Sequence, residues 1–151
     1  MRIADPFTKA AEALSAATSV ALACHVNPDA DALGSMLGLS NHLRAMGKET
    51  VCSFPNHPFE PPRWASLLPG TEALVPPSAF PEDPPVMVTC DVASLDRLAS
   101  LGGAAVRAKT LIWIYHHVTN DGRGTIPIID PGETKTVTLN GLLPAFPFCD
   151  S

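Results

Sequence analysis

The chain has 151 residues, a length that fits one domain with a buried core. Hydrophobic residues make up 46% of it and charged residues 17%, a balance that excludes a disordered polypeptide. The net charge of −5 excludes a broad basic surface for long nucleic acids, so metal ions would have to supply much of the positive charge facing a phosphorylated substrate.

No apolar run approaches the ~20 residues of a membrane span, and charged residues interrupt the N-terminal region where a signal peptide has its apolar core. We therefore expect a cytoplasmic protein without a membrane partner. The four cysteines show no CxxC spacing. We expect Cys24, Cys52 and Cys90 to be small buried residues in or beside strands, with disulfides as the less favoured alternative.

The apolar pattern predicts helices and strands that alternate along the chain. In chain order these are a helix over 5–17, a strand over 20–24, a helix over 32–46, a strand over 50–54, a strand over 86–90, a helix over 95–101, and strands over 110–115 and 125–129. Asp5 is suited to cap the first helix, and Gly47 ends the second. Ser94 is suited to cap the third helix, which we expect to end at Gly102 and Gly103.

Residues 55–85 differ from the rest of the chain because they contain ten of its sixteen prolines. Proline removes backbone donors and fixes φ, so this segment is predicted to be mostly a connecting loop, with one short helix around 63–68. We interpret it as a long internal crossover. A linker between two domains is the alternative, although little chain precedes it for a separate core.

Alternating strands and helices of this length predict an α/β fold with a parallel sheet, right-handed crossovers and helices on both faces. The chain shows no internal repeat. In such a sheet the carboxyl ends of the strands lie at one edge, where open α/β sheets bind their ligands. Polar side chains that directly follow the predicted strands are therefore the candidates for a functional site.

The first such group is His25, Asp29 and Asp31, which follow the predicted strand over 20–24. Mixed nitrogen and oxygen donors without thiolate suit Mn²⁺ or Mg²⁺ better than a structural Zn²⁺. In an extended chain His25 and Asp29 would lie ~13 Å apart at ~3.3 Å per residue, so the chain must curl if they share an ion. Pro28 favours such a turn.

Gly34 lies in the first turn of the predicted helix that follows. Without a Cβ it would let this turn approach the site, where a helix N-terminus favours an anionic phosphate. Gly34 and Gly38, four residues apart, could also form a close packing face of the helix, and the two roles are compatible.

Two further strand ends carry metal-binding groups: Asp91 follows the strand over 86–90, and His116 with His117 follows the strand over 110–115. Alone, an aspartate after a strand caps the next helix more often than it binds a metal, and a histidine pair is more often surface or hydrogen-bonded core. Three such strand ends in one small domain together predict a metal-dependent phosphoesterase site.

Three segments, HVNPDADALGS at 25–35, VTCDVASLDRLA at 88–99 and HHVTN at 116–120, resemble the DHH phosphoesterase superfamily. The resemblance extends over residues 4–131. Within the superfamily it points to the bacterial nanoRNase/pAp phosphatase group, which degrades short oligoribonucleotides and dephosphorylates 3′-phosphoadenosine 5′-phosphate. It implies a DHH-type, Rossmann-like N-terminal domain, and short RNA oligonucleotides or nucleotide phosphates as partners.

The resemblance also implies a site with two divalent cations, Mn²⁺ being favoured and Mg²⁺ the alternative. His25 and Asp29 would ligate one ion, and Asp31 the other. Asp91 would bridge both ions as a catalytic residue, and His116 would join the second.

Two other residues are candidates for contact with the substrate. The resemblance implies that His117 faces the substrate phosphate as a second catalytic residue. Arg123 could contact phosphate as well, although exposed arginines are usually just solvated.

The chain departs from the family in two respects. Tyr115 stands where the family's triplet has an aspartate beside the metal ligands, and a neutral, bulky side chain there is expected to weaken metal binding or activity. Relatives also continue into another metal-ligating aspartate and a second, substrate-holding domain. We therefore expect residues 1–151 to form a C-terminally truncated version of the catalytic domain, with Asp130 too close to His117 to replace the missing ligand.

Two rivals to an oligoribonuclease or pAp phosphatase remain open. One is a non-catalytic domain that binds metal, nucleotide or a protein partner, which Tyr115 and the missing region favour. The other is a different phosphate chemistry within the superfamily, such as hydrolysis of pyrophosphate or of a cyclic dinucleotide. The sequence leaves the oligomeric state open, a homodimer included.

Overall fold

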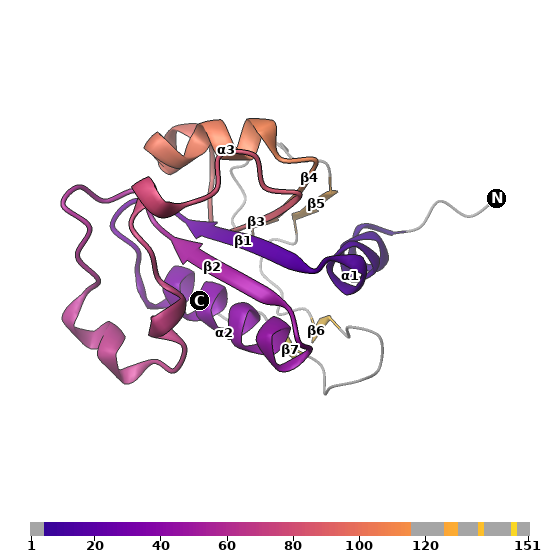
Figure 1. Ribbon diagram of the computed structural model, residues 1–151, viewed down its shortest axis with the longest axis horizontal. Coiled ribbons are helices and arrows are strands. Elements are labelled where there is room, and N and C mark those ends of the chain that lie inside the picture. Colours follow the sequence, from indigo (N-terminus) through magenta and orange to yellow (C-terminus); the bar gives the residue numbers. More distant parts are fainter. Residues whose placement is uncertain (1–4, 116–125, 130–135, 138–145, 148–151) are drawn as a thin grey trace.

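Five parallel strands in the order β2-β1-β3-β4-β5 form the centre of the computed structural model (Figure 1). The structure describes residues 5–115, 126–129, 136–137 and 146–147. The strands of the sheet are β1 (Ser19–Cys24), β2 (Glu49–Ser53), β3 (Val86–Cys90), β4 (Thr110–Tyr115) and β5 (Ile126–Ile129). Two further short strands, β6 (Thr136–Val137) and β7 (Phe146–Pro147), pair antiparallel with each other.

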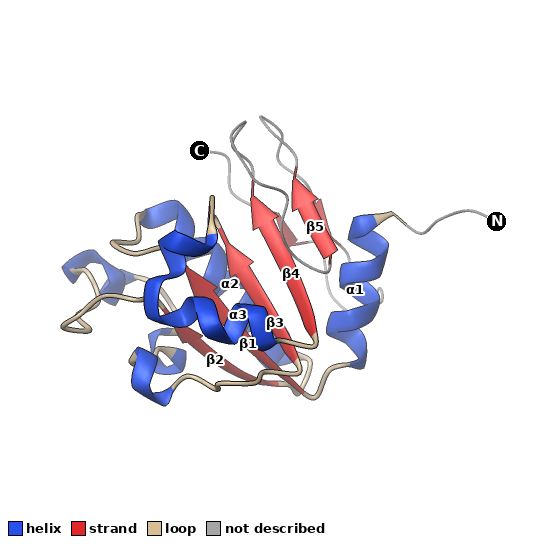
Figure 2. Ribbon diagram, turned by 90° about the horizontal axis from the view of Figure 1, so that it is seen from above, coloured by secondary structure: helices blue, strands red, loops and turns tan. Residues whose placement is uncertain are grey.

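Helices cover both faces of the sheet, as the sequence predicts. They are α1 (Pro6–Ala16), α2 (Ala30–Ala45) and α3 (Gly102–Arg107), with the 3₁₀ helices η1 (Arg63–Leu67), η2 (Thr71–Ala73), η3 (Pro77–Ala79) and η4 (Leu95–Leu101). Helices α1 and α2 pack on one face, and η4 with α3 on the other. Figure 2 shows α1 lying beside β5 at one side of the sheet.

Side chains of β1 alternate between the two cores. Val20, Leu22 and Cys24 join the core under α1 and α2. Ala21 and Ala23 join the core under η4 and α3. A parallel strand covered on both faces is apolar throughout, which explains why this segment reads as a continuous hydrophobic run.

The strand order makes the chain change direction between β1 and β3. From β1 it proceeds outward to β2, then returns to the other side of β1 and continues through β3, β4 and β5. The crevice outside the carboxyl ends of strands at such a switch point is the usual ligand site of an open α/β sheet. Cys24 and Cys90 pair in register across this point, so the chain leaves both strands side by side.

The boundaries of most elements match the sequence prediction closely. Strands β3 and β4 coincide with the predicted ranges 86–90 and 110–115. Asp5 caps α1, accepting hydrogen bonds from the backbone N–H groups of Phe7 and Thr8 at 3.0 and 3.1 Å. Helix α2 begins at Ala30 instead of residue 32, because the Asp29 side chain caps it by accepting from the N–H of Ala32 at 2.8 Å.

The prediction that a helix over 95–101 ends at Gly102 and Gly103 is wrong. The segment over 95–101 is the 3₁₀ helix η4, which is interrupted at Ala99 with φ of 43°, and α3 begins at Gly102. Burial of Ala104 and Ala105 against the sheet stabilises α3 despite the low helix propensity of its two glycines. Ser94 occupies the cap position of η4 but makes no side-chain capping hydrogen bond.

The proline-rich segment 55–85 joins β2 to β3 and contains η1, η2 and η3. Part of it returns to β2, where the N–H of Val75 donates to the carbonyl of Cys52 at 2.8 Å. The Ser53 hydroxyl donates to the Val75 carbonyl at the same distance. These bonds satisfy backbone groups on the outer edge of β2, which would otherwise be open to pairing with another chain.

Cys24, Cys52 and Cys90 are buried free thiols, as predicted for small residues of strands. Burial raises the pKa of each thiol, that of Cys52 to about 11. The thiolate form is therefore disfavoured at these positions. Among the helices that the structure describes, none has both the length and the apolar character needed to cross a membrane.

Candidate metal centre

The loop that leaves β1 presents His25 at the switch point of the sheet. Its imidazole is buried, and Nδ1 lies 2.7 Å from the carbonyl oxygen of Val26. A carbonyl oxygen can only accept, so Nδ1 carries the proton in this contact. In the neutral ring this leaves the lone pair on Nε2. Nε2 is the nitrogen that faces the carboxylates of Asp29, in the same loop, and of Asp91, which directly follows β3.

Two carboxylates approach this nitrogen from different segments. His25 Nε2 lies 3.6 Å from Asp91 Oδ2 and 3.9 Å from Asp29 Oδ1. One ligand atom from each of the three side chains lies within 4.8 Å of the other two. Asp91 is 8% exposed and Asp29 63%, so the group opens to solvent on the side of Asp29.

The backbone turns sharply at two points to bring these groups together. Asn27 and Asp91 have φ values of 52° and 57°, in the left-handed region that asparagine and aspartate tolerate better than most residues. The N–H of Asp91 donates to the carbonyl of Ile114 at 3.0 Å, continuing the ladder between β3 and β4. Asp91 thus lies where the described ladder between β3 and β4 ends, with its carboxylate 3.6 Å from His25 Nε2.

The electrostatics of the group favour a bound cation. A neutral imidazole whose Nε2 lone pair faces two carboxylates is repelled by them unless a proton or a metal ion lies between. The Asp91 carboxylate accordingly raises the pKa of His25, and burial of the ring opposes the shift. A proton on Nε2 and a metal ion therefore compete for the same place.

The donor set fits a divalent ion of the Mn²⁺ or Mg²⁺ type. With bonds of ~2.1 Å, neighbouring ligands of an octahedral ion lie ~3 Å apart and opposite ones ~4 Å. The distances of 3.6 and 3.9 Å from His25 Nε2 to the two carboxylates fall in this range. Carboxylates suit these hard ions, and the neutral imidazole nitrogen of His25 adds a third donor for a divalent cation.

Asp29 has two roles because it also caps α2. Its Oδ1 accepts from the N–H of Ala32, which fixes the carboxylate relative to the helix. The same oxygen lies 3.9 Å from His25 Nε2, and a carboxylate oxygen has a second lone pair with which to meet a cation. The N-terminus of α2 therefore meets the site, where the helix dipole favours negative charge.

Gly34, in the first turn of α2, is half-buried. A Cβ added there would meet no described atom within 4 Å. Among the described residues, therefore, no close approach at this position requires a glycine, and the expected role of Gly34 beside the site stays a prediction.

The structure brings together three of the predicted metal ligands, His25, Asp29 and Asp91. Asp31 lies in the first turn of α2 and is not part of that three-residue group. Its negative charge contributes to the raised pKa of Cys90, so Asp31 lies within electrostatic range of the end of β3. His116, His117 and Arg123 lie outside the residues that the structure describes.

Tyr115 is the last residue of β4 and is buried on the side of the sheet that η4 and α3 cover. It packs there with Trp113, Leu98 and other apolar residues. An aspartate in its place would enter the same apolar cluster. The surroundings of this position are therefore suited to the tyrosine that the sequence has.

One residue that sequence analysis missed is Asn56, which follows β2 and hydrogen-bonds to Asn27 in the His25–Asp29 loop. The two asparagines are 29 positions apart in the sequence. Neither local spacing nor chemistry indicates the contact. It follows only from the placement of β2 beside β1.

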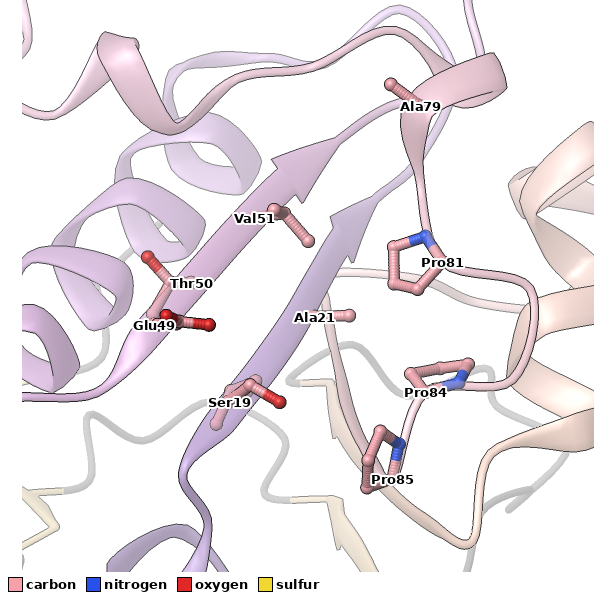
Figure 3. A pocket seen from close by; sticks show the side chains of 10 residues that line it. Ser19, Ala21, Glu49, Thr50, Val51, Ala79, Pro81, Pro84 and Pro85 are labelled. Carbon is pink, nitrogen blue, oxygen red and sulfur yellow. The ribbon is translucent and has the colours of Figure 1, made fainter.

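A pocket of about 260 Å³ lies at the opposite ends of β1 and β2, where these strands begin (Figure 3). Its lining residues are Ser19, Val20, Ala21, Glu49, Thr50, Val51, Ala79, Pro81, Pro84 and Pro85. Figure 3 shows the rings of the three prolines facing Ala21 and Val51. Among the described residues that line it, Glu49 is the one titratable group, so these residues do not form a donor set for a metal.

The family model for the N-terminal domain of the DHH family matches residues 19–143. A curated relative, the bifunctional oligoribonuclease and PAP phosphatase NrnA of Thermus thermophilus, is 34% identical over 139 residues. The match covers 92% of this chain and 39% of the relative, so the chain spans about two fifths of that protein's length.

A solved structure, that of an exopolyphosphatase-related protein from Bacteroides fragilis, superposes with a TM-score of 0.73 at 22% identity. The superposition covers 83% of this chain and 38% of that one. This superposition shows that the chain shares the fold of the matched part of the Bacteroides protein. The family-model match over residues 19–143 shows that the chain belongs to the DHH family of phosphoesterases and contains its N-terminal domain.

Proposed function

We propose that this domain binds divalent cations and takes part in the hydrolysis of short oligoribonucleotides, of 3′-phosphoadenosine 5′-phosphate, or of both. The observation that carries the proposal is the convergence of His25, Asp29 and Asp91 at the switch point of the sheet. Their donor atoms lie within 4.8 Å of one another, although the three residues come from two different strand ends.

The proposed ligand set extends the three residues to two ions, of which Mn²⁺ is the favoured kind. In this proposal His25 and Asp29 would hold the first ion, Asp91 would contribute to both, and Asp31 with His116 would hold the second. When bound, two such ions lower the pKa of a water molecule and stabilise negative charge on the phosphate oxygens.

The chain's own residues prepare this site in three ways. The Val26 carbonyl holds the proton of His25 on Nδ1 and so leaves Nε2 as a ligand. The N–H of Ala32 fixes the Asp29 carboxylate. In the proposal His117 faces the substrate phosphate, and Arg123 contacts it from the same segment.

Two features support short nucleotides as substrates. The net charge of −5 disfavours binding along a long polyanion, whereas a terminal phosphate can be held by ions and a helix N-terminus. The Thermus relative is named as an oligoribonuclease and PAP phosphatase.

A second candidate function is a domain that binds metal or nucleotide without catalysis. The observation that favours it is Tyr115, which is buried among apolar residues at the position of the family's aspartate. A tyrosine is neutral near pH 7, since its ordinary pKa is ~10, and does not supply that negative charge.

The test compares Asp91→Asn with Asp96→Asn, a matched removal of one negative charge from an exposed position on η4. Asparagine tolerates the left-handed backbone of residue 91, so Asp91→Asn is expected to fold. Mn²⁺ binding is measured by calorimetry, and turnover with an RNA dinucleotide and with 3′-phosphoadenosine 5′-phosphate.

The proposal expects wild type and Asp96→Asn to bind Mn²⁺ and turn over a substrate, and Asp91→Asn to lose both. Mn²⁺ binding without turnover of either substrate would favour the non-catalytic candidate. If the wild-type protein does not bind Mn²⁺, the metal-dependent hydrolysis and the metal-binding form of the second candidate are both wrong.

A further inference from the structure

Two asparagines form a reciprocal contact beside the candidate metal centre. The backbone N–H of Asn27 donates to Asn56 Oδ1 at 2.8 Å, and Asn56 Nδ2 donates to Asn27 Oδ1 at 2.8 Å. Because a backbone N–H can only donate, the first bond also fixes which end of the Asn56 amide faces the loop. The contact ties the loop after β2 to the loop that carries His25 and Asp29.

The N–H of Asn27 and the carbonyl of Val26 belong to the same peptide group. That carbonyl accepts the proton of His25 Nδ1 at 2.7 Å. A continuous chain of hydrogen bonds therefore runs from Asn56 Oδ1 through one peptide unit to the imidazole of His25. Each bond in such a chain polarises the next, so the Asn56 contact makes the Val26 carbonyl a better acceptor.

The orientation of this peptide is otherwise strained. Asn27 has φ of 52°, and the preceding N–H, that of Val26, donates to the carbonyl of Arg97 at 3.1 Å. Consecutive amide groups are thus held from opposite sides, by the segment after β3 and by the segment after β2. Removal of Asn56 leaves only one of these two ties in place.

Two acceptors compete for the single ring proton of neutral His25. The Val26 carbonyl favours a proton on Nδ1, and the carboxylates of Asp91 and Asp29, which face Nε2, favour a proton there. Only the first arrangement leaves Nε2 free to ligate a metal. Any group that makes the Val26 carbonyl a stronger hydrogen-bond acceptor therefore favours the tautomer in which His25 Nε2 can ligate a metal.

We propose that Asn56 is a positioning residue that holds the Val26–Asn27 peptide and thereby keeps the ring proton of His25 on Nδ1. The consequence for metal affinity rests on the proposed function, in which His25 Nε2 is a ligand. The consequence for the His25 tautomer does not, because it concerns the metal-free protein.

The experiment uses Asn56→Ala, with Asn41→Ala as the matched control. Asn41 also donates a side-chain hydrogen bond across the fold, to the carbonyl of Pro69 at 3.0 Å, but it lies near the end of α2 away from the site. Asn56→Leu, similar in shape and without hydrogen-bonding groups, is the second variant should Asn56→Ala not fold.

Two quantities are measured for each folded variant. The first is the tautomer of His25 in the metal-free protein, from the ¹⁵N chemical shifts of its ring at a pH where the ring is neutral. The second is the dissociation constant for Mn²⁺. Asn56→Ala is expected to move the proton toward Nε2 and to weaken Mn²⁺ binding about tenfold, the lower end of the ~10–100-fold loss typical of such supporting contacts.

Asn56→Asp is a conservative substitution that serves as a further control, because its carboxylate still accepts the hydrogen bond from the N–H of Asn27. It is expected to retain the wild-type tautomer, as is Asn41→Ala. A wild-type tautomer and wild-type Mn²⁺ affinity in Asn56→Ala would overturn the inference and leave the proposed function intact. A moved tautomer in a protein that never binds Mn²⁺ would support the inference and overturn the proposed function.

Discussion

The two ends of strands β1 and β2 differ in shape and in chemistry. Where the strands begin, an apolar pocket is walled by Pro81, Pro84 and Pro85, and Glu49 is the one titratable group among the described residues that line it. Where β1 ends, His25 is joined by Asp91 from the neighbouring β3, with donor atoms 3.6 Å apart. The sheet therefore has an apolar pocket where β1 and β2 begin. It has convergent candidate ligand groups where β1 and β3 end.

Under the proposed function, the chemistry lies where the candidate ligand groups converge and not at the apolar pocket. Open α/β sheets bind ligands outside the carboxyl ends of their strands, where loops can vary without disturbing the core. The prolines at the amino ends shape a pocket but offer neither donors nor a helix N-terminus to an anion.

The largest effect is expected for His25→Ala. The substitution removes a proposed ligand, so Mn²⁺ affinity should fall more than ~100-fold, beyond the range seen when only a supporting contact is lost. Glu49→Gln, which removes a charge from the pocket at the opposite edge, should leave the affinity unchanged. Calorimetric titration of both variants checks the comparison. An equal loss of affinity in the two would mean that His25 is not a ligand.

The next largest effect is expected from pH. The Asp91 carboxylate raises the pKa of His25 above its ordinary value of 6.5, so metal-free His25 keeps its second proton to a higher pH than an ordinary histidine. Metal must displace that proton, hence Mn²⁺ affinity should be constant above the His25 pKa and fall about tenfold per pH unit below it. Titrations at several pH values measure this. An affinity that stays constant through the histidine range would exclude Nε2 as a ligand.

The fold was largely predictable because its strands are short apolar runs with polar or proline residues at their ends. Strands β3 and β4 match the prediction residue by residue. Helix α3 was missed because Gly102 and Gly103 locally resemble a helix stop. What stabilises α3 is burial of Ala104 and Ala105 against the sheet, a tertiary effect that local sequence does not contain.

The site was predictable in its residue types and only partly in its geometry. The spacing of His25 and Asp29 and the position of Asp91 at a strand end indicated ligands. The register between Cys24 and Cys90, which places His25 beside Asp91, depends on strand pairing over a long sequence separation. The contact of Asn27 with Asn56 has the same origin, and nothing near either residue indicates it.

A change at the end of β4 should separate metal affinity from stability. Tyr115→Asp restores the family's negative charge, so we expect about tenfold tighter Mn²⁺ binding. The same change buries a carboxylate in the cluster with Trp113 and Leu98, so the free energy of unfolding should fall by ~2 kcal/mol without metal. Tyr115→Phe, which keeps the ring, is the control. Titration and denaturant unfolding measure the two effects, and unchanged Mn²⁺ affinity in Tyr115→Asp would contradict the first.

The smallest expected effect distinguishes the two roles of Asp29. Asparagine is as good a cap as aspartate, so Asp29→Asn should keep the stability of α2 and weaken only Mn²⁺ binding. Asp29→Ala removes both functions and should also lower the free energy of unfolding by ~1 kcal/mol. Urea unfolding without metal and Mn²⁺ titration of both variants give the two quantities. Because Asp29 is largely exposed, its contribution to stability is expected to come from the cap and not from its charge. If Asp29→Asn and Asp29→Ala lose a similar amount of stability, the charge and not the cap is what stabilises the protein.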